Sequence, residues 1–528
     1  MTESRHRIVK IIIYILCAIA AVVWCVAYFM RFTSFINCPA EYRDNAFTGI
    51  INAMCTGVNP YTFDYVADMT APGVLLDSGF IHILPAVLVC KLFGTAPLQT
   101  LYITNMIYSL IAAYLMYVIV KNVTHKGILG VMSATLSLMY VLRFGMLIAR
   151  PDVMALLCQI IIIAQMIQAE RHDKKNVNLL IIALMAVLIV YSKPHYAMIV
   201  LAYVIYLLVG KRDIKSVGIL AIFGLAWTVV FTVVVWLICP AHITIWIERL
   251  YEMFAGVGTN ITDSTLSGRL IDKWIQIAKQ FLPFGVLIVA RGIQRIVHKE
   301  RYNTLSRLEQ FMIIDLVLNA LFLCYTGRHV GAGLWYFYFT LLPAINILSM
   351  IAIDKMGGDK KTGIVLMMLA CLWICYRAVR LVPNTDEMSR WKNNALAVEA
   401  LDDYRSDVMY LSPVLVGCSE PNYVFDYGDQ VYVPQKESVL YSILPLLKNN
   451  VAVNEAFNEY YEYVIDTIDE CGYSVVVTDS VDSAITGEAR ERFASVLNEK
   501  YYVADQRDYY TETVDVKLDY WVPKENYR

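Results

Sequence analysis

The chain has 528 residues, of which 58% are hydrophobic and 17% charged, and its mean hydropathy is +0.52. Soluble proteins carry roughly 25% charged residues, so this composition excludes a disordered chain, a disulfide-stapled mini-domain and an ordinary cytosolic enzyme. The net charge of −2 hides two opposite regions. Residues 400–528 contain 10 basic and 24 acidic residues, a net of −14, while the rest contains 44 − 10 = 34 basic and 46 − 24 = 22 acidic residues, a net of +12.

Eleven apolar runs are long enough to cross a bilayer, which takes about 17–25 residues in a helix. In chain order they lie near 8–30, 97–120, 127–147, 151–169, 177–193, 194–210, 216–239, 280–297, 309–326, 335–353 and 362–382. A twelfth run near 79–93 is shorter and contains His82 and Pro85, and we expect it to form a helix in the membrane interface. The chain is thus predicted to be a polytopic α-helical membrane protein with about eleven transmembrane helices.

The basic residues between these runs predict an orientation. If 79–93 does not cross the membrane, every Lys/Arg cluster between spans falls on the side of the basic N-terminus. Because basic loops are cytoplasmic, we expect the N-terminus inside the cell and residues 383–528 outside it. Residues 1–382 then form a transmembrane domain whose large first extracytoplasmic loop spans 31–96. The first run reads as a retained span, because no small-residue cleavage pattern follows it.

Residues 383–528 are predicted to form an extracytoplasmic α/β domain, in which strands and helices alternate. Its role is expected to be a cap or the positioning of an acceptor. We expect short strands at Val408–Ser412, Tyr423–Tyr427, Val451–Val453 and Ser474–Thr478, and helices at 437–448, 457–471 and 486–499.

Charged residues recur at the outer ends of the spans, against the bias that places basic residues inside. This set comprises Asp44, Arg150, Asp152, Lys193, His195, Arg328 and His329. Cations gathered on the outer membrane face indicate an anionic ligand such as a lipid phosphate. Simpler interpretations remain open: Arg-Pro-Asp at 150–152 also suits a helix start, and Ser-Lys-Pro-His at 192–195 also suits a tight turn.

Five short motifs in this order resemble the GT-C superfamily of integral-membrane glycosyltransferases. The first outer loop has Glu-Tyr-Arg-Asp at 41–44 and Gly-Val-Asn-Pro-Tyr at 57–61. A short amphipathic helix then ends in Lys-Leu-Phe-Gly at 91–94, and the two later turns carry Ala-Arg-Pro-Asp at 149–152 and Ser-Lys-Pro-His at 192–195. The resemblance covers about residues 8–382.

The resemblance implies an enzyme that moves a hexosyl or pentosyl group from a polyprenyl-phosphate-linked donor at the outer face of a bacterial plasma membrane, in cell-envelope synthesis. The acceptor is a lipid, a glycan or a protein; membrane lipids are further partners, and no nucleic acid is expected. In this family a carboxylate of the first outer loop acts as the base. Asp44 is the best positional match, and Glu41, one helical turn earlier, is the alternative.

The resemblance also implies roles for the other polar residues. Arg150, Lys193 and Arg328 neutralise the leaving phosphate, and His195 and His329 donate hydrogen bonds to it or serve the structure alone. Asp152, Asp77 and Tyr61 are candidates for positions beside the acceptor, although Asp77 also suits a helix N-cap. A divalent metal is compatible with these carboxylates, but no Asp-x-Asp pair in the first loop supports one.

A transporter or flippase for a lipid or small solute, with an extracytoplasmic domain, is the main alternative. Such proteins place charged groups near the bilayer midplane and contain internal repeats. The charged residues noted above cluster at span ends instead, which favours the transferase.

Overall fold

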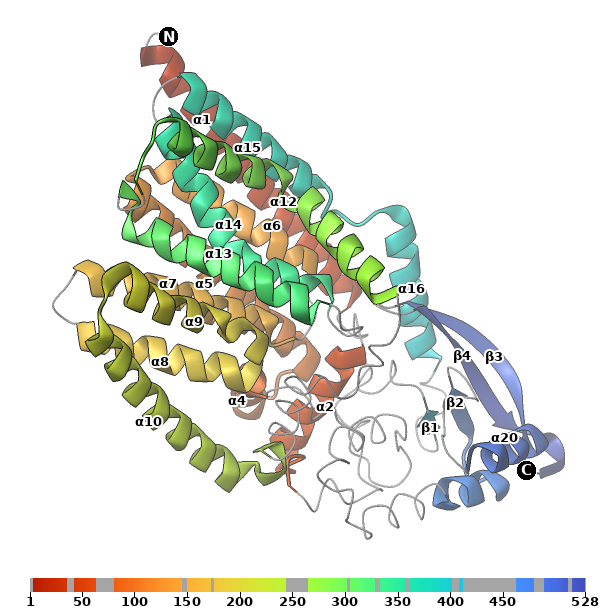
Figure 1. The fold of residues 1–528 in the computed structure, drawn as a ribbon. Helices are drawn as coiled ribbons and strands as arrows, with labels where there is room; N and C mark the ends of the chain where they lie inside the picture. The colour runs from red at the N-terminus through yellow and green to blue at the C-terminus, as the bar shows by residue number, and fades with distance from the viewer. Residues whose placement is uncertain are drawn as a thin grey trace.

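The computed structural model is a helical bundle that carries a small sheet at one end (Figure 1). The structure describes residues 3–35, 42–62, 80–144, 150–171, 175–243, 265–301, 304–327, 333–357, 361–400, 408–411, 462–478, 489–510 and 515–527. The predicted strands at Tyr423–Tyr427 and Val451–Val453 and the predicted helix at 437–448 lie outside these described residues.

Each of the eleven predicted runs corresponds to a helix of the bundle. Ten helical segments of the described chain are long and apolar enough to cross a membrane, and the apolar part of α6, Gly127–Arg143, is slightly shorter. The helices are α1 (Glu3–Ser34), α5 (Pro97–Thr124), α6 (Gly127–Phe144), α7 (Asp152–Arg171), α8 (Lys175–Ser192), α9 (Met198–Ile205) between the 3-10 turn η2 (Pro194–Ala197) and the π-helical turn η3 (Tyr206–Lys211), α10 (Ile214–Ile238), α12 (Thr265–Val297), α13 (Arg307–Thr326), α14 (Leu334–Gly357) and α15 (Lys361–Val379).

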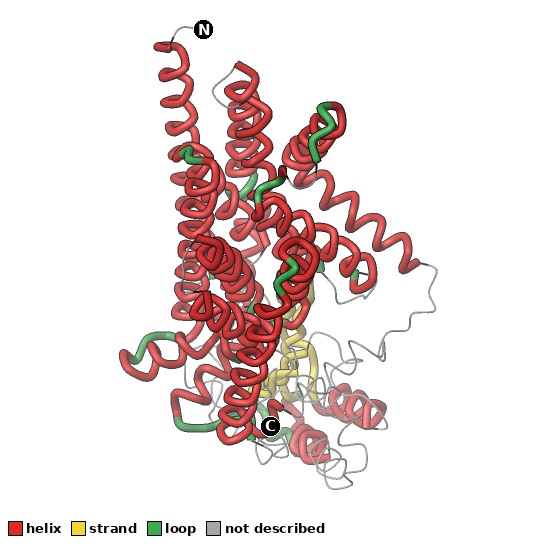
Figure 2. Tube along the Cα trace, turned by 60° about the vertical axis from the view of Figure 1, so that its left-hand side comes forward, coloured by secondary structure: helices red, strands yellow, loops and turns green. Residues whose placement is uncertain are grey.

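The two ends of the bundle differ. At one end Phe35, just after α1, and Leu98, at the start of α5, pack into one apolar cluster with strand residues such as Val475. We call this the sheet end. Because the short-linked helices alternate in direction, the α5–α6, α7–α8, η3–α10, α12–α13 and α14–α15 connections all lie at the opposite end, here called the distal end. Figure 2 shows the N-terminus far from the strands, in agreement with this arrangement.

Helix α14 forms the centre of the bundle. Every residue of its most apolar window is buried, and the helix contacts α5, α6, α7, α12, α13 and α15. Its Asn346 donates hydrogen bonds to the Ser133 carbonyl at 2.9 Å and to the Ser137 hydroxyl at 3.0 Å, both on α6. Such interhelical bonds satisfy polar groups that water does not reach, so α14 is fixed in register against its neighbours.

Short helices follow α1 at the sheet end. They are α2 (Tyr42–Thr56), the 3-10 turn η1 (Ile81–Ile83) and α4 (Leu84–Phe93). Helix α4 ends at Gly94, whose φ of 63° closes the helix in the left-handed conformation that glycine adopts without strain. The predicted short run at 79–93 is therefore η1 with α4, and the ten residues of α4 rise only about 15 Å, half the thickness of a bilayer core.

The C-terminal region contains a mixed four-stranded sheet in the order β1-β2-β4-β3. The strands are β1 (Val408–Leu411), β2 (Val475–Thr478), β3 (Tyr501–Tyr510) and β4 (Asp515–Pro523). β1 pairs with β2 in parallel, and the other two pairings are antiparallel. The predicted strands at 408–412 and 474–478 are confirmed over Val408–Leu411 and Val475–Thr478. The predicted helices at 457–471 and 486–499 are confirmed over 462–469 and over α20 (Ala489–Lys500).

Helix α16 (Thr385–Glu399) joins the bundle to this sheet. Its Trp391 ring lies 4.8 Å from the ring of Phe35, and its Asn394 side chain forms two hydrogen bonds with the backbone of Tyr510 in β3. The Tyr520 hydroxyl of β4 donates to the Ala397 carbonyl at 2.8 Å. The chain ends in a 3-10 turn, Glu525–Tyr527, beyond β4. The sheet is thus held by α16 and packs against the end of α1 and the start of α5 rather than hanging from a free linker.

Candidate functional site

Three segments far apart in the sequence meet at the sheet end of the bundle. They are the turn that precedes α7, the α8–η2 turn, and the first residues of α14. Four of the predicted site residues, Arg150, Asp152, Lys193 and His195, lie in the first two segments, and aromatic side chains from the third connect them.

Arg150 is held against an indole ring. Its side chain is only 2% exposed, and its guanidinium carbon lies 4.0 Å from the centroid of Trp335 at the start of α14. Stacking of a guanidinium on an indole is a favourable cation–π contact. The stacking fixes the position of the guanidinium at the sheet end of the bundle.

Lys193 and His195 share the next ring of α14. The Lys193 ammonium lies 4.7 Å from the centroid of Tyr336. The imidazole of His195 stacks on the same ring, with centroids 5.2 Å apart and planes 5° apart. Pro194 begins η2 directly after Lys193, whose φ of −158° and ψ of 92° are extended, as expected for the residue before a proline. This turn presents both side chains to α14.

Asp152 occupies the first position of α7 and is 1% exposed. Its Oδ1 accepts a hydrogen bond of 2.6 Å from the hydroxyl of Tyr196, which follows His195 in η2. The carboxylate therefore joins the α7 start to the α8–η2 turn, in addition to its favourable place at a helix N-terminus. Arg150, Lys193 and Asp152 together have a formal charge of +1.

Tyr61 belongs to a neighbouring aromatic cluster. Its ring lies 4.9 Å from Phe80 and 5.3 Å from His242, and all three side chains are buried. The Ala241 amide donates to the Tyr61 carbonyl at 3.0 Å, which ties the first outer loop to the segment after α10. Burial lowers the pKa of His242 to about 4, so the imidazole is neutral at neutral pH.

An apolar pocket of about 380 Å³ lies beside this cluster, between α2, α4 and α10. Its walls include Val58, Phe80 and Val234, and Lys91 is the charged residue of its lining. The pocket is linked to the site through Tyr191, which precedes Lys193 by two residues. Phe231 of the pocket wall packs on Tyr191, with ring centroids 6.2 Å apart.

The remaining predicted residues are only partly placed. Asp44 lies in the first turn of α2, at the sheet end, but its side chain is outside the described part of the chain. Glu41, Asp77, Arg328 and His329 lie outside the described residues altogether. Within the described ranges no group of three or more His, Cys, Asp and Glu side chains is suitably placed for a metal ion.

Sequence reasoning missed the aromatic half of the site. Trp335 and Tyr336 stand at the start of an apolar span, where aromatic residues usually mark the membrane interface. Nothing in their position therefore indicated that their rings contact Arg150 and Lys193. It also missed Lys273 of α12, whose ammonium donates to the Gly327 carbonyl at 2.9 Å, just before the predicted Arg328 and His329.

Asp315 corrects the expectation that the charged residues cluster at span ends. It lies mid-way along α13 and is completely buried, and its Oδ1 accepts a hydrogen bond of 2.8 Å from Asn319. One such carboxyl among the described spans does not make a transport path, but it is a buried acidic group that the membrane interior makes costly.

The fold is that of the GT-C integral-membrane glycosyltransferases, and the chain is a multi-pass membrane protein. Residues 80–236 match the family described as dolichyl-phosphate-mannose-protein mannosyltransferase. This match includes the part of the pocket lining from Phe80 to Val235 and the predicted site residues Arg150, Asp152, Lys193 and His195.

Solved structures of this fold are similar along nearly the whole chain. ArnT from Cupriavidus metallidurans bound to undecaprenyl phosphate superposes with a TM-score of 0.61 at 13% identity, over 96% of this chain and 97% of that one. The same protein in its apo state gives a TM-score of 0.55 with the same identity and coverage. The Archaeoglobus fulgidus oligosaccharyltransferase gives 0.48 at 11% identity, over 94% of this chain and 72% of that one. No curated protein sequence is significantly similar to the chain.

Proposed function

We propose that the protein transfers a sugar from a polyprenyl-phosphate-linked donor to an acceptor hydroxyl or amide at the sheet end of the bundle. The observation that carries this proposal is the pair of cations, Arg150 and Lys193, held over the rings of Trp335 and Tyr336. The two rings fix these cations in place, and cations held on adjacent rings favour the binding of an anionic ligand.

The apolar pocket suits the lipid part of such a donor. It is lined mainly by apolar side chains, such as Val58, Leu84 and Val234. The contact between Phe231 and Tyr191, two residues before Lys193, supports binding of an isoprenoid chain in this pocket with its phosphate beside Arg150 and Lys193. The complex of ArnT with undecaprenyl phosphate supports this class of ligand, because that protein has the same fold.

In the proposed reaction Asp44 accepts the proton of the acceptor as its oxygen or nitrogen attacks the anomeric carbon of the sugar. The bond between that carbon and the phosphate oxygen breaks, and its electron pair leaves with the polyprenyl phosphate. Arg150, Lys193 and Arg328 stabilise the charge that grows on this phosphate. His195 and His329 donate hydrogen bonds to it, and Asp152 and Tyr196 hold the turn that carries Lys193. Glu41 is the alternative base, and Asp77 and Tyr61 are the residues proposed to contact the acceptor.

We further propose that the sheet end faces outward from a bacterial plasma membrane, with the N-terminus in the cytoplasm. The basic residues of the distal connections, such as Lys126, Lys175 and Lys211, support this orientation through the positive-inside bias. Residues 383–528 then form an extracytoplasmic domain above the site, while residues 1–382 form the membrane domain.

The proposal is tested with purified protein in lipid nanodiscs and a set of radiolabelled polyprenyl-phosphate sugars of hexose and pentose type. Wild-type protein is expected to release polyprenyl phosphate from one donor class, and Asp44→Asn and Lys193→Met are expected to lose most of that activity. Asn45→Asp, the reverse substitution at the next residue, serves as the matched control for Asp44→Asn. Full activity in Asp44→Asn removes Asp44 as the base. Movement of lipid across liposomes without any transfer by wild-type protein supports a flippase instead.

A further inference from the structure

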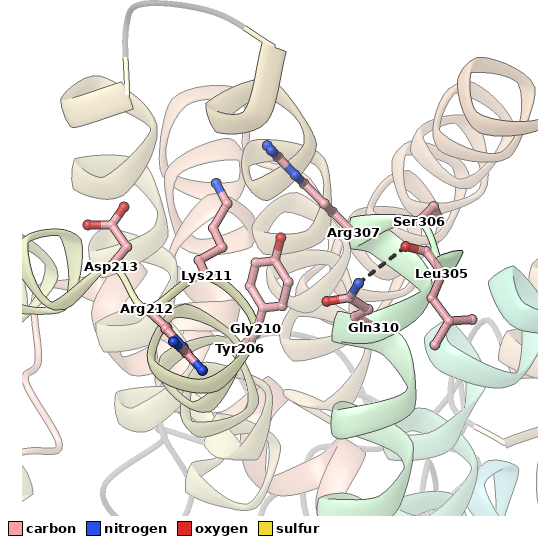
Figure 3. A pocket seen from close by; sticks show the side chains of 9 residues that line it. All are labelled: Tyr206, Gly210, Lys211, Arg212, Asp213, Leu305, Ser306, Arg307 and Gln310. Atoms are coloured by element: carbon pink, nitrogen blue, oxygen red, sulfur yellow. Dashed lines mark hydrogen bonds between the residues drawn. The ribbon is translucent and has the colours of Figure 1, made fainter. Parts of the chain in front are cut away.

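A cavity of about 600 Å³ lies at the distal end of the bundle, between η3 and the start of α13. Figure 3 shows the side chains that line it. Three of them are cations, Lys211, Arg212 and Arg307, and one is a carboxylate, Asp213. The cavity shares no residue with the site at the sheet end, so the reaction proposed above does not explain it.

The backbone around this cavity departs from regular α-helix. Residues Tyr206–Lys211 form a π-helical turn, and Arg212 ends it with a φ of 55°. π-Helical turns are rare and occur frequently at functional sites. Gly210 keeps the wall open: a Cβ atom there would lie 3.1 Å from the Tyr206 ring and 3.3 Å from the Gln310 amide oxygen. Gln310 is itself fixed by donating to the Leu305 carbonyl at 3.2 Å (Figure 3).

The charges around the cavity do not balance. Glu170 of α7 forms ion pairs with both Lys211 and Arg307, and Asp213 forms one with Lys175. Lys175 also lowers the pKa of the Asp213 carboxyl to about 2, so this carboxylate is charged at neutral pH. Glu309 adds a third carboxylate, which accepts a hydrogen bond from the Ser306 amide at 2.8 Å. Four cations therefore face three carboxylates, an excess of +1. Among the described residues, no carboxylate forms an ion pair with Arg212.

The surroundings of the cavity are apolar and exposed. Leu208 and Val209 in η3 are 42% and 69% exposed, and Ile214, the first residue of α10, is 73% exposed. Helix α10 itself is a predicted span with only 6% of its apolar window buried inside the protein. These exposed apolar side chains suit contact with lipid chains, whereas a small water-soluble anion would make no use of them.

We propose that this cavity binds the phosphate group of an anionic membrane lipid, whose hydrocarbon chains lie along η3 and α10. Arg212 and Arg307 supply the planar forks that hydrogen-bond phosphate oxygens in pairs, and Lys211 adds a point charge beside them. The cavity volume falls within the usual range for small-molecule sites, about 300–1,000 Å³, and suits a lipid head group.

The test measures the thermal unfolding temperature of the full-length protein in detergent as dioleoylphosphatidylglycerol, dioleoylphosphatidylcholine or inorganic phosphate is titrated. We expect stabilisation by phosphatidylglycerol and little by the zwitterionic lipid. Arg212→Gln removes one charge-assisted contact and is expected to raise the lipid concentration for half-maximal stabilisation roughly tenfold. Arg301→Gln, an exposed cation of the same end that does not line the cavity, is the matched control.

A second variant keeps the test independent of Arg212. Gly210→Ala places a methyl group against Tyr206 and Gln310, narrows the cavity without changing any charge, and is expected to weaken the lipid response too. Equal responses of wild type and both variants overturn the site. An equal loss of lipid stabilisation in Arg301→Gln overturns the site as well, because the effect then arises from the overall positive charge of this end and not from a specific site. Stabilisation by inorganic phosphate as strong as that by phosphatidylglycerol keeps the anion site but overturns the lipid as its occupant.

Discussion

The imidazole of His195 and the phenol ring of Tyr336 lie almost parallel, 5° apart, with their centroids separated by 5.2 Å. Because Lys193 lies over the same ring at 4.7 Å, one aromatic side chain of α14 orients two polar residues of a turn that belongs to other helices. The positions of the α8–η2 turn and of α14 are thereby coupled.

Replacing Tyr336 is expected to disturb both residues together. Tyr336→Leu removes the stacking surface and the cation–π contact, which contribute on the order of 0.5–2 kcal/mol, and the KM for the lipid-linked donor is expected to rise several-fold. Tyr336→Phe keeps the ring and is expected to stay close to wild type. Steady-state kinetics of sugar transfer check this. A leucine variant with unchanged donor KM would contradict the role of the ring.

The hydrogen bond between Tyr196 and Asp152 is expected to stabilise the fold of the site. Tyr196→Phe removes a donor from a buried carboxylate, and a hydrogen bond to a charged group contributes about 1.5–3 kcal/mol. The melting temperature is therefore expected to fall. In Asp152→Asn/Tyr196→Phe the two losses are expected to be less than additive. Tyr114→Phe, on the exposed face of α5, is the control. Additive losses would show that the two side chains act separately.

The stability of the protein is expected to depend on pH through His242. Its pKa is lowered from 6.5 in the unfolded chain to about 4 by burial, so the folded form holds the imidazole neutral. The unfolded chain takes up this proton below about pH 6.5. The contribution of His242 is therefore full above that pH and is lost as the pH falls toward 4, by about 3 kcal/mol in total.

Thermal unfolding between pH 4 and pH 8 measures this effect. His242→Phe cannot bind the proton and is expected to show a flatter decline than wild type over the acidic half of the range. His298→Gln, an exposed histidine at the distal end, is expected to leave the curve unchanged. A wild-type slope that persists in His242→Phe would assign the acid sensitivity to other groups.

Filling the apolar pocket is expected to discriminate between long and short donors. Val234 lines the pocket, so Val234→Trp occupies volume that an isoprenoid chain would use. The donor KM is expected to rise by about an order of magnitude for an undecaprenyl donor and much less for a two-isoprene analogue. Val229→Trp, on the same helix but outside the pocket lining, serves as control. An equal rise in KM for both donors would show that the pocket does not hold the lipid chain.

The orientation of the chain in the membrane is open to direct measurement. A cysteine placed at Glu499, at the end of α20 near the sheet, is expected to react in intact cells with a maleimide that does not cross membranes. A cysteine at Asn176, in the first turn of α8 at the distal end, is expected to react only after lysis. Wild-type protein gives the background of its native cysteines. The opposite pattern would reverse the sidedness proposed for the site.

The helices of the membrane domain were predictable because twenty apolar residues in a row have few alternatives. The convergence of Arg150 and Lys193 also followed from sequence, since alternating spans return both turns to the same end. The contact of these cations with aromatic rings could not be predicted from the sequence. Only the packing of α14 at the centre of the bundle reveals that Trp335 and Tyr336 face these turns.

The C-terminal sheet shows a second limit of sequence reasoning. β3 alternates buried and exposed residues and includes Asp505, Arg507 and Asp508 among its exposed or half-exposed positions, so no continuous apolar run predicted it. The buried strand β2 was predicted because Val475–Val477 form such a run. Asp315 went unnoticed because a single acidic residue barely lowers the hydropathy of a twenty-residue span, whatever its surroundings.

The contact between Cys17 of α1 and Cys371 of α15, with sulfur atoms 3.8 Å apart and 354 positions separating them, has a consequence for biosynthesis. The first helix enters the membrane early in translation, but its partner leaves the ribosome only after most of the protein has been made. Throughout that interval α1 has α6 as a neighbour, but the face that later packs on α15 contacts lipid or the insertion machinery. Premature termination before α15 therefore leaves a membrane-embedded chain whose first helix lacks one of its two main neighbours, a substrate suited to membrane quality-control proteases.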